Sequence, residues 1–480
     1  MTYYLAIDIG ASSGRHMLGH RADGKLVLEE VYRFPNGMIK RDGQLVWDVD
    51  ALLAHILEGM RRCGELGKIP KSVGIDTWSV DFVLLDKTGT RLGPAVCYRN
   101  GRTKGADALV EQKISFTALY NKTGIQKQIF NTIYQLAALQ RDVPELLDTA
   151  KTFLMLPDYF HYRLTGKMAS EYTNATSTAL VGATSKTWDR ELIQRLGLPQ
   201  TLFTNLIMPG TVVGSLTAEI AKQVGYSCDV TLPATHDTAS AFMAAPVQEN
   251  DAIYLSSGTW SLIGIESPVP IVTDYARQKN FTNEGGYAYR FRFLKNIMGL
   301  WMLQEVRRET GEQYSFAALA QMAKESGAPA AIVDVNDQAF LAPDSMIAAV
   351  KQVARQLGQA EPDSLGQVIQ CIYYSLAKSY ADTVAQLEEA TGRKFTTLHI
   401  LGGGSQDSYL NTLTAKATGL TVYAGPVEGT ATGNLMVQMM AAGEINSLED
   451  GRQMIRDSFP ITKIQGDILD GTICRDKKAI

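Results

Sequence analysis

The sequence predicts an α/β protein of two similar domains, because one pattern occurs once in each half of the chain. An apolar strand from Tyr4 ends near Asp8, a turn of small residues follows (Gly10-Ala11-Ser12-Ser13-Gly14), and residues 15–19 resume an extended pattern. The same order recurs at residues 252–264, around Ser256-Ser257-Gly258-Thr259. A strand, a small-residue turn and a returning strand are typical of a β-hairpin. Two such hairpins indicate an internal duplication, so we expect one domain over residues 1–245 and a second over residues 246–480.

The other predicted elements suit an α/β fold. Helical spacing of apolar residues predicts a helix within residues 47–66, and short apolar runs predict strands at 73–76, 82–86 and 398–401. A long helix is expected over 364–391, between a capping Ser364 and a terminating Gly392. A helix should begin at Ser408, and residues 295–304 are expected to form another helix, with Asn296 and Gln304 as its polar members.

Composition excludes several classes of protein. The 480 residues include 45% hydrophobic and 20% charged residues, which is typical of a globular chain. Lys and Arg number 46 and Asp and Glu number 50, so the net charge of −4 does not favour nucleic-acid binding. The N-terminus does not resemble a signal peptide, and no apolar run is long enough to span a membrane. We therefore expect a cytoplasmic protein, either a monomer or a small homo-oligomer.

The five cysteines predict neither a zinc site nor a disulfide framework. They are odd in number, widely spaced and form no CxxC pair. They are Cys63, Cys97, Cys228, Cys371 and Cys474.

The first hairpin has the composition of a phosphate-binding turn. Small residues let backbone N–H groups approach phosphate oxygens, Ser12 and Ser13 add hydroxyl donors, and Arg15 adds a positive charge. Asp8 could hold a hydrated Mg²⁺ beside the same phosphates. The alternative is an ordinary hairpin with a surface arginine. The turn matches neither the P-loop nor the dinucleotide-binding glycine pattern.

The second hairpin supports the phosphate-binding interpretation. Its turn, which contains Thr259, offers another cradle of phosphate size. Gly402-Gly403-Gly404 follows a predicted strand and precedes a predicted helix, where it leaves room for a flat ring against the backbone. A flexible loop is the alternative for the three glycines.

Two further segments carry polar groups suited to a sugar and its phosphorylation. His236, Asp237 and Thr238 precede small residues that resemble a helix start, and a carboxylate there could accept the proton of an attacking hydroxyl. The alternative to a catalytic role is that Asp237 is the N-cap of the helix. A second segment, Trp78-Ser79-Val80-Asp81, follows a predicted strand and combines an aromatic ring with polar groups, as sugar-binding pockets do. The alternative is a tight turn with a buried Trp.

Taken in order, these segments resemble the FGGY carbohydrate kinases. The resemblance runs from about Tyr4 to Ser458, and its closest match is to members that phosphorylate L-rhamnulose. The segments that carry it are Asp8 to Arg15, Asp76-Thr77-Trp78, Asp158-Tyr159, Leu164-Thr165-Gly166, residues 172–176, Gly210 to Gly214, residues 235–240, 254–262 and 295–300, and Gly402-Gly403-Gly404.

The resemblance implies two actin-like, ribonuclease-H-like ATPase domains with an ATP and sugar cleft between them. It implies that ATP and Mg²⁺ are required, that Asp237 is the general base for the C1 hydroxyl of L-rhamnulose, and that the reaction belongs to L-rhamnose degradation. The implied ATP contacts are Ala11, Ser12, Ser13, Gly14, Arg15, Thr259, Gln304 and Gly402, and the implied ketose contacts are Ser79, His236, Asp237, Thr238 and Asn296.

Three alternatives stay open. Ser79 stands where related kinases have glycine, so another ketose such as fuculose or xylulose is one alternative substrate. An actin-like ATPase would hydrolyse ATP without sugar, and a nucleotide-sensing module would bind ATP without transferring phosphate.

Overall fold

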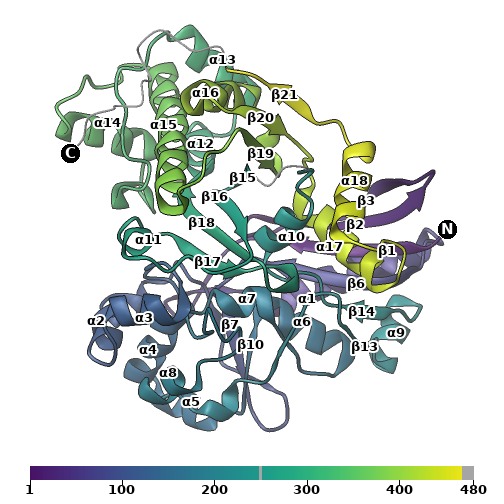
Figure 1. The fold of residues 1–480 in the computed structure, drawn as a ribbon. Coiled ribbons are helices and arrows are strands. Elements are labelled where there is room, and N and C mark those ends of the chain that lie inside the picture. Colours follow the sequence, from purple (N-terminus) through teal and green to yellow (C-terminus); the bar gives the residue numbers. More distant parts are fainter. Residues whose placement is uncertain (248–250, 467–480) are drawn as a thin grey trace. The chain divides into compact units, whose positions relative to one another are not determined.

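The computed structural model of the protein describes residues 1–247 and 251–466 (Figure 1). The chain forms two compact units, each assembled from separate stretches of sequence. The first unit comprises Met1–Ala244, Glu266–Phe293 and Gly429–Ser458, and the second comprises Ala245–Ile265, Leu294–Glu428 and the segment from Phe459. Cys474 lies outside the described residues.

The first unit is built on a six-stranded sheet. In spatial order its strands are β13 (Val212–Ser215), β14 (Asp229–Thr231), β6 (Pro70–Thr77), β1 (Tyr3–Ile9), β2 (Ser13–Ala22) and β3 (Lys25–Pro35). The predicted first hairpin is confirmed, since β1 and β2 pair antiparallel with Asp8 opposite Arg15. Strand β6 pairs with β1 in parallel, which sets Asp76 opposite Asp8. Two acidic residues are therefore neighbours at the carboxyl ends of two central strands of the sheet.

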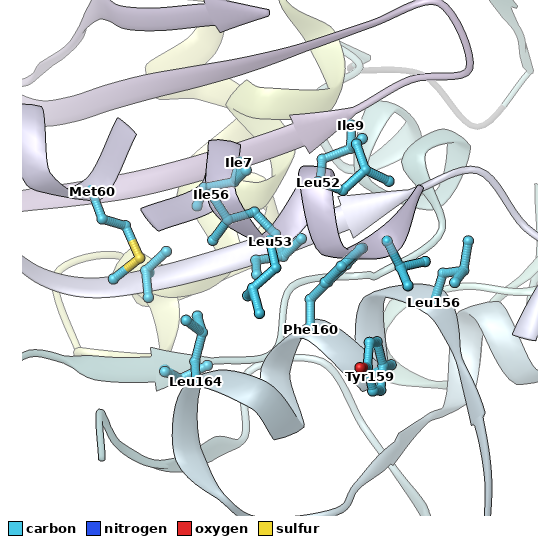
Figure 2. Close-up of a cluster of buried hydrophobic side chains, with 14 of the residues drawn as sticks. Ile7, Ile9, Leu52, Leu53, Ile56, Met60, Leu156, Tyr159, Phe160 and Leu164 are labelled. Carbon is cyan, nitrogen blue, oxygen red and sulfur yellow. The ribbon is translucent and has the colours of Figure 1, made fainter. Parts of the chain in front are cut away.

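Apolar packing fixes the position of strand β1. Helix α1 (Val49–Glu65) is capped by Asp48, whose side chain accepts a hydrogen bond from the amide of Ala51. Side chains of α1 and of helix α6 (Leu156–Thr165) belong to one buried apolar cluster. Figure 2 shows Ile7 and Ile9 of β1 among the buried side chains of both helices. Burial of each such side chain is worth about 1.5–3 kcal/mol. The cluster thus anchors the strand that ends near Asp8.

Shorter elements complete the first unit. Its other strands are β4 (Ile39–Arg41), β5 (Gln44–Trp47), β7 (Phe82–Leu85), β8 (Arg91–Leu92), β9 (Ala95–Val96), β10 (Thr152–Met155), β11 (Ser170–Glu171), β12 (Leu206–Ile207) and β17 (Thr282–Gly285). Its other α-helices are α2 (Ala106–Glu111), α3 (Phe116–Thr123), α4 (Thr132–Asp142), α5 (Pro144–Thr149), α7 (Tyr172–Thr176), α8 (Arg190–Arg195), α9 (Ala218–Val224), α10 (Asp237–Met243), α11 (Asp274–Gln278), α17 (Gly429–Ala441) and α18 (Leu448–Ser458). Short 3₁₀ turns occupy Gly101–Thr103, Gln200–Leu202 and Tyr287–Tyr289.

The second unit repeats the central arrangement of the first. Six strands lie side by side in the order β18 (Phe291–Met298), β16 (Trp260–Ser267), β15 (Ala252–Ser257), β19 (Thr397–Leu401), β20 (Thr421–Ala424) and β21 (Thr462–Ile464). Strands β15 and β16 form the second predicted hairpin, and β19 pairs with β15 in parallel. Both units therefore contain an antiparallel hairpin whose first strand also pairs with a parallel neighbour.

Helix α15 (Leu365–Thr391) has the predicted bounds. Ser364 accepts a hydrogen bond from the amide of Gln367, and Gly392 ends the helix in the left-handed conformation. The other helices of this unit are α12 (Trp301–Glu309), α13 (Phe316–Glu325), α14 (Met346–Gln356) and α16 (Ser408–Thr418), with 3₁₀ turns at Gln338–Phe340 and Gly403–Gln406. Within the described residues, no helix is both long and apolar enough to cross a membrane.

The predicted helix over residues 295–304 is wrong for residues 295–300 and correct only for 301–304. Residues up to Met298 belong to strand β18, and α12 begins only at Trp301. Gly299 separates the two elements, and a Cβ there would lie 2.6 Å from the backbone carbon of Trp260. Pairing with the neighbouring strand thus overrides the helical spacing of the sequence.

Candidate active site

The carboxyl groups of Asp8 and Asp237, both in the first unit, lie within electrostatic reach of a third, that of Asp76. Asp8 is the last residue but one of strand β1, Asp76 the last but one of β6, and Asp237 begins helix α10. A backbone bridge between Thr77 and His236 ties the start of α10 to the end of β6. Nε of Arg15 lies 3.2 Å from Oδ2 of Asp8, so one guanidinium partly neutralises the cluster.

Asp76 is the most deeply buried member of the cluster. Burial raises the pKa of its carboxyl well above the usual value, and the negative charges of Asp8 and Asp237 raise it further. A hydrogen bond from Nδ2 of Asn434, 2.5 Å from Oδ2, opposes the shift. Asp76 was not among the predicted site residues. The signal was present, because the strands at 4–8 and 73–76 each reach an aspartate, and parallel pairing brings such ends together.

The first hairpin turn is tight and well supported. The amide of Gly10 donates to the carbonyl of Ser13 at 2.9 Å, and Nδ2 of Asn36 donates to the carbonyl of Gly10 at 2.8 Å. A Cβ on Gly14 would lie 2.1 Å from the ring of Phe34, so a larger residue would have to displace that buried ring. Ser12 at the tip is exposed. The turn therefore presents its backbone and a hydroxyl in a fixed conformation.

The Asp237 carboxylate has one restrained oxygen and one open oxygen. Oδ1 accepts from the amide of Thr238 at 2.5 Å and from its hydroxyl at 3.0 Å, and Nε2 of His236 lies 3.4 Å away. Within the described residues Oδ2 makes no hydrogen bond or ion pair, and 31% of the side chain is exposed. The N-cap of α10 is His236, so Asp237 is not the capping residue.

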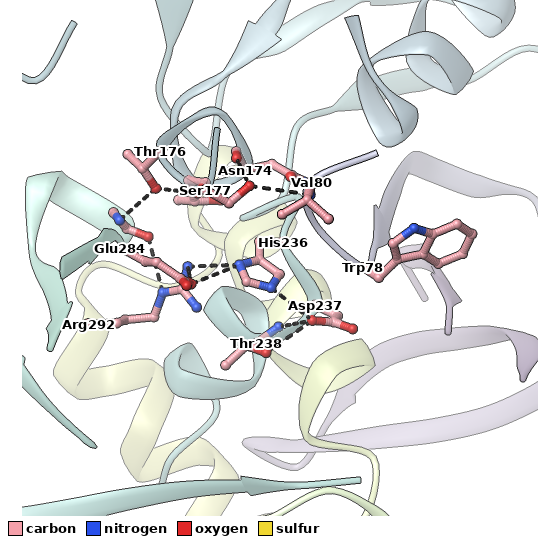
Figure 3. Close-up of polar contacts among 12 residues, drawn as sticks. Trp78, Val80, Asn174, Thr176, Ser177, His236, Asp237, Thr238, Glu284 and Arg292 are labelled. Atoms are coloured by element: carbon pink, nitrogen blue, oxygen red, sulfur yellow. Dashed lines mark hydrogen bonds and ion pairs between the residues drawn. The ribbon is translucent and has the colours of Figure 1, made fainter. Parts of the chain in front are cut away.

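A buried charged network lies behind the His236 ring (Figure 3). Nη2 of Arg292 is 3.0 Å from Nδ1 of His236 and 3.1 Å from Oε2 of Glu284. Neither Glu284 nor Arg292 was predicted as a site residue. They lie about 50 residues beyond His236 in the sequence, and the local pattern around them gives no reason to pair them with it.

The turn after strand β6 holds Trp78 rigidly. The carboxylate of Asp81 accepts from the indole nitrogens of Trp47 at 2.6 Å and Trp78 at 2.9 Å. Burial raises the pKa of Asp81 to about 6, against the lowering effect of these donors. Val80 has a φ of 68°, a conformation that is costly for a β-branched residue. The turn thus presents the half-buried Ser79 from a strained but heavily hydrogen-bonded loop.

In the second unit, the hairpin turn and the glycine triplet are packed together. A Cβ on Gly404 would lie 2.0 Å from Oγ of Ser257, and Gly402 has a φ of 83°. Thr259 donates its hydroxyl to Oε1 of Gln304 at 3.5 Å. The structure therefore brings three predicted ATP contacts into one region, and the close packing does not fit a flexible loop.

Asn296, on strand β18, has a buried side-chain oxygen without a hydrogen-bond partner in the described part of the chain. A buried carbonyl oxygen of this kind normally has a donor. Asn296 is therefore suited to accept a hydrogen bond from a bound molecule.

The predicted metal position has suitable ligand chemistry. No group of three or more His, Cys, Asp or Glu side chains among the described residues is arranged to hold a metal ion. Mg²⁺, however, is commonly held by one or two carboxylates together with waters and substrate phosphates. The carboxylate of Asp8, beside the turn at residues 10–14, fits that mode of binding.

Comparison with known proteins gives a consistent result. Residues 3–244 match the N-terminal domain, and residues 253–442 the C-terminal domain, of the FGGY family of carbohydrate kinases. A rhamnulokinase of Halalkalibacterium halodurans is 49% identical over 463 residues (96% of this chain, 98% of the relative), and one of Bacillus subtilis is 45% identical over 459 residues (95% and 94%).

Solved structures share the fold at low sequence identity. A xylulose kinase from Lactobacillus acidophilus superposes with a TM-score of 0.77 at 15% identity (97% of this chain, 94% of the other). A glycerol kinase from Plasmodium falciparum superposes with a TM-score of 0.76 at 14% identity (98% and 95%). The predicted α/β fold class is confirmed by this likeness.

Proposed function

Because the chain belongs to the FGGY family of carbohydrate kinases, we propose that it transfers the terminal phosphoryl group of ATP to the C1 hydroxyl of L-rhamnulose. The products are ADP and L-rhamnulose 1-phosphate. The choice of substrate is supported by relatives named rhamnulokinase that are 43–50% identical over nearly the whole chain. Cytoplasmic location, oligomeric state and a division of the chain after residue 245 stay predictions.

The observation that carries the proposal is the arrangement of the Asp237 carboxylate. Oδ1 is held by its neighbours, whereas Oδ2 is open and points to no partner in the described chain. Oδ2 accepts the proton of the C1 hydroxyl as the hydroxyl oxygen forms a bond to the terminal phosphorus. The bond from that phosphorus to the bridging oxygen breaks, and ADP leaves.

The charge of the neighbouring carboxyls suits this role. The raised pKa of Asp76 favours its protonated form, which reduces repulsion around Asp8 and Asp237. Arg15, the amides of the turn at residues 10–14 and the hydroxyls of Ser12 and Ser13 would stabilise negative charge on the phosphates. Most of the catalysis of phosphoryl transfer arises from such positioning and charge stabilisation.

ATP and its metal account for the remaining predicted contacts. Thr259, Gln304 and Gly402 would bind the nucleotide, and Asp8 would hold Mg²⁺ through water and phosphate oxygens. The metal, when bound, would supply positive charge that stabilises the transferring phosphoryl group. In the ketose site, Ser79, His236 and Thr238 would contact hydroxyl groups, and Oδ1 of Asn296 would accept a hydrogen bond from the sugar.

A panel of ketoses with ATP and Mg²⁺ tests the substrate. ADP release is measured with L-rhamnulose, L-fuculose and D-xylulose, and without sugar. We expect the highest kcat/KM with L-rhamnulose and little hydrolysis without sugar. A preference for another ketose would reject the proposed substrate, and fast hydrolysis without sugar would indicate an ATPase.

The variant Asp237→Asn tests the base. The amide cannot accept the proton, so kcat should fall by about 10²–10⁴-fold, while ATP and ketose still bind. Asp274→Asn is a matched control, because Asp274 also begins a helix but its side chain is 76% exposed. Near-normal turnover of Asp237→Asn would remove Asp237 from the proposed role.

A further inference from the structure

A buried arginine and a buried glutamate contact the imidazole that precedes Asp237. The side chain of Arg292 is 1% exposed, that of Glu284 is 6% exposed and that of His236 is 5% exposed. Nε of Arg292 donates to the carbonyl of Gly285 at 3.1 Å, and Nη2 faces both Glu284 and His236. The arginine is therefore held from two sides with its guanidinium against the ring.

Stability alone does not explain this pair. Desolvation of two buried charges often cancels their attraction, so an apolar pair of similar size is commonly as stable. Burial favours the neutral form of Glu284, yet the charge of Arg292, and after it the contact with His236, hold the pKa of that carboxyl below its usual value. The pair thus remains ionised in a place where charges are costly, which suggests a role in orienting its neighbour.

Nδ1 of His236 has two polar neighbours, and they demand opposite protonation states. Arg292 can only donate, so its 3.0 Å contact requires a lone pair on Nδ1. Glu284 can only accept, so a bond to it would require a proton on Nδ1. The Nδ1–Oε2 distance is longer, at 3.3 Å, and Oε2 lacks a geometrically acceptable hydrogen bond in the described chain. The contacts therefore favour the lone pair.

We propose that Arg292, held by Glu284, is a positioning residue that fixes the tautomer of His236, so that Nε2 carries the ring proton and faces Oδ1 of Asp237. Nε2 lies 3.4 Å from that oxygen, a charge contact rather than a hydrogen bond, so its proton faces the negative charge of the carboxylate. The other tautomer would direct a lone pair at the same oxygen and repel it. Oδ1 is thereby occupied by donors, and Oδ2 is left as the basic oxygen.

Nuclear magnetic resonance of ring nitrogens tests the tautomer without any assay of activity. The chain has 6 histidines, and the His236 signals are identified by their loss in His236→Asn. We expect Nε2–H in the wild type and in Glu284→Gln, since Arg292 still donates to Nδ1. In Arg292→Met we expect a change towards Nδ1–H. A wild-type ring protonated on Nδ1 alone, or a tautomer unaffected by Arg292→Met, would overturn the proposal.

Kinetics test the consequence, which rests on the proposed function. Arg292→Met should lower kcat by about 10–100-fold, as misplacement of a catalytic group does, and leave the KM for ATP within about twofold. Arg292→Lys, which keeps a charged donor, should recover part of the loss and fold even if Arg292→Met does not. A kcat unchanged in Arg292→Met, or Arg292→Lys no better than Arg292→Met, would contradict the positioning role.

A control separates positioning from loss of stability. Arg452 is also buried, and its guanidinium lies 2.9 Å from Glu266 and donates to the carbonyl of Phe242. Arg452→Met should destabilise the first unit without changing the His236 tautomer. If it changed the tautomer as Arg292→Met does, the effect would be a general loss of structure. If no ketose were phosphorylated, the proposed function would fail, and the tautomer result would stand by itself.

Discussion

The substitution Gly433→Ala should displace Asp237, the proposed base, through the packing of two helices. Gly433 lies in α17, and Asp237 is the first residue of α10. A Cβ on Gly433 would lie 1.8 Å from the carbonyl oxygen of Ser240 and 2.6 Å from its carbon. Both atoms are backbone atoms of α10, so no side-chain rotation can relieve the overlap.

The expected size of the effect follows from these distances. Carbon–oxygen contacts are normally about 3.3 Å or longer, so the helices must separate by roughly 1.5 Å at this point. Overpacking of this kind costs about 1–3 kcal/mol, and alanine returns about 1 kcal/mol of helix propensity. A displacement of about 1 Å in a catalytic group can lower kcat about 100-fold. We therefore expect a modest loss of stability and a large loss of turnover.

Denaturant unfolding and the ADP-release assay measure the two effects. Gly451→Ala in α18 is the matched control, because the three atoms nearest to its Cβ all belong to the flexible side chain of Met436. That side chain can move, so stability and kcat should remain near those of the wild type. A Gly433→Ala variant with unchanged stability and kcat would refute the reasoning.

Two further predictions concern the other regions of the site. Burial raises the pKa of Asp81 to about 6 in the folded protein, so ionisation of this carboxyl lowers the free energy of unfolding above pH 6, and this loss disappears as the pH falls towards 4. The effect amounts to about 3 kcal/mol, and the pH dependence of unfolding of Asp81→Asn should lack it. Unfolding curves between pH 4 and 7 check this, and parallel profiles for both proteins would contradict it. Gly404→Ala should raise the KM for ATP, because its Cβ would displace Ser257 and the hairpin turn. Gly101→Ala should not, since Gly101 is exposed and, outside its chain neighbours, no atom lies within 4 Å of its Cβ. Equal ATP kinetics in the two variants would show that the packing of the triplet against the turn is not needed for ATP use.

Structural elements that depend on a short stretch of sequence could be predicted. The hairpin at Asp8, the long helix from Ser364 and the start of α10 each have local signals, namely small-residue turns, caps and apolar spacing. The strand at Lys295 was not, because its helical spacing is overridden by pairing with β16 and by the close approach of Gly299 to a neighbouring backbone.

Electrostatic interactions between residues far apart in the chain could not be predicted from the sequence either. Asp76 differs from other aspartates through its burial beside Asp8, and this depends on strand pairing and on Asn434, more than 350 residues away. The contact of Arg292 with His236 has no spacing rule, since it arises where two separate segments of the first unit pack together. Such residues are found only when the fold is known.

The repeated framework of the two units explains why the chemistry is assigned to the first. In each unit the first hairpin strand pairs with a parallel neighbour, and the two strand ends lie side by side. In the first unit that pair is Asp8 and Asp76, whereas in the second it is Ser256 and Leu401, neither of which carries a charge. The same backbone arrangement therefore places two carboxyl groups side by side in the first unit, close to the proposed base Asp237, and places uncharged groups at the matching position of the second unit. The two units share this backbone arrangement, and the side chains at the strand ends determine which unit carries negative charge there.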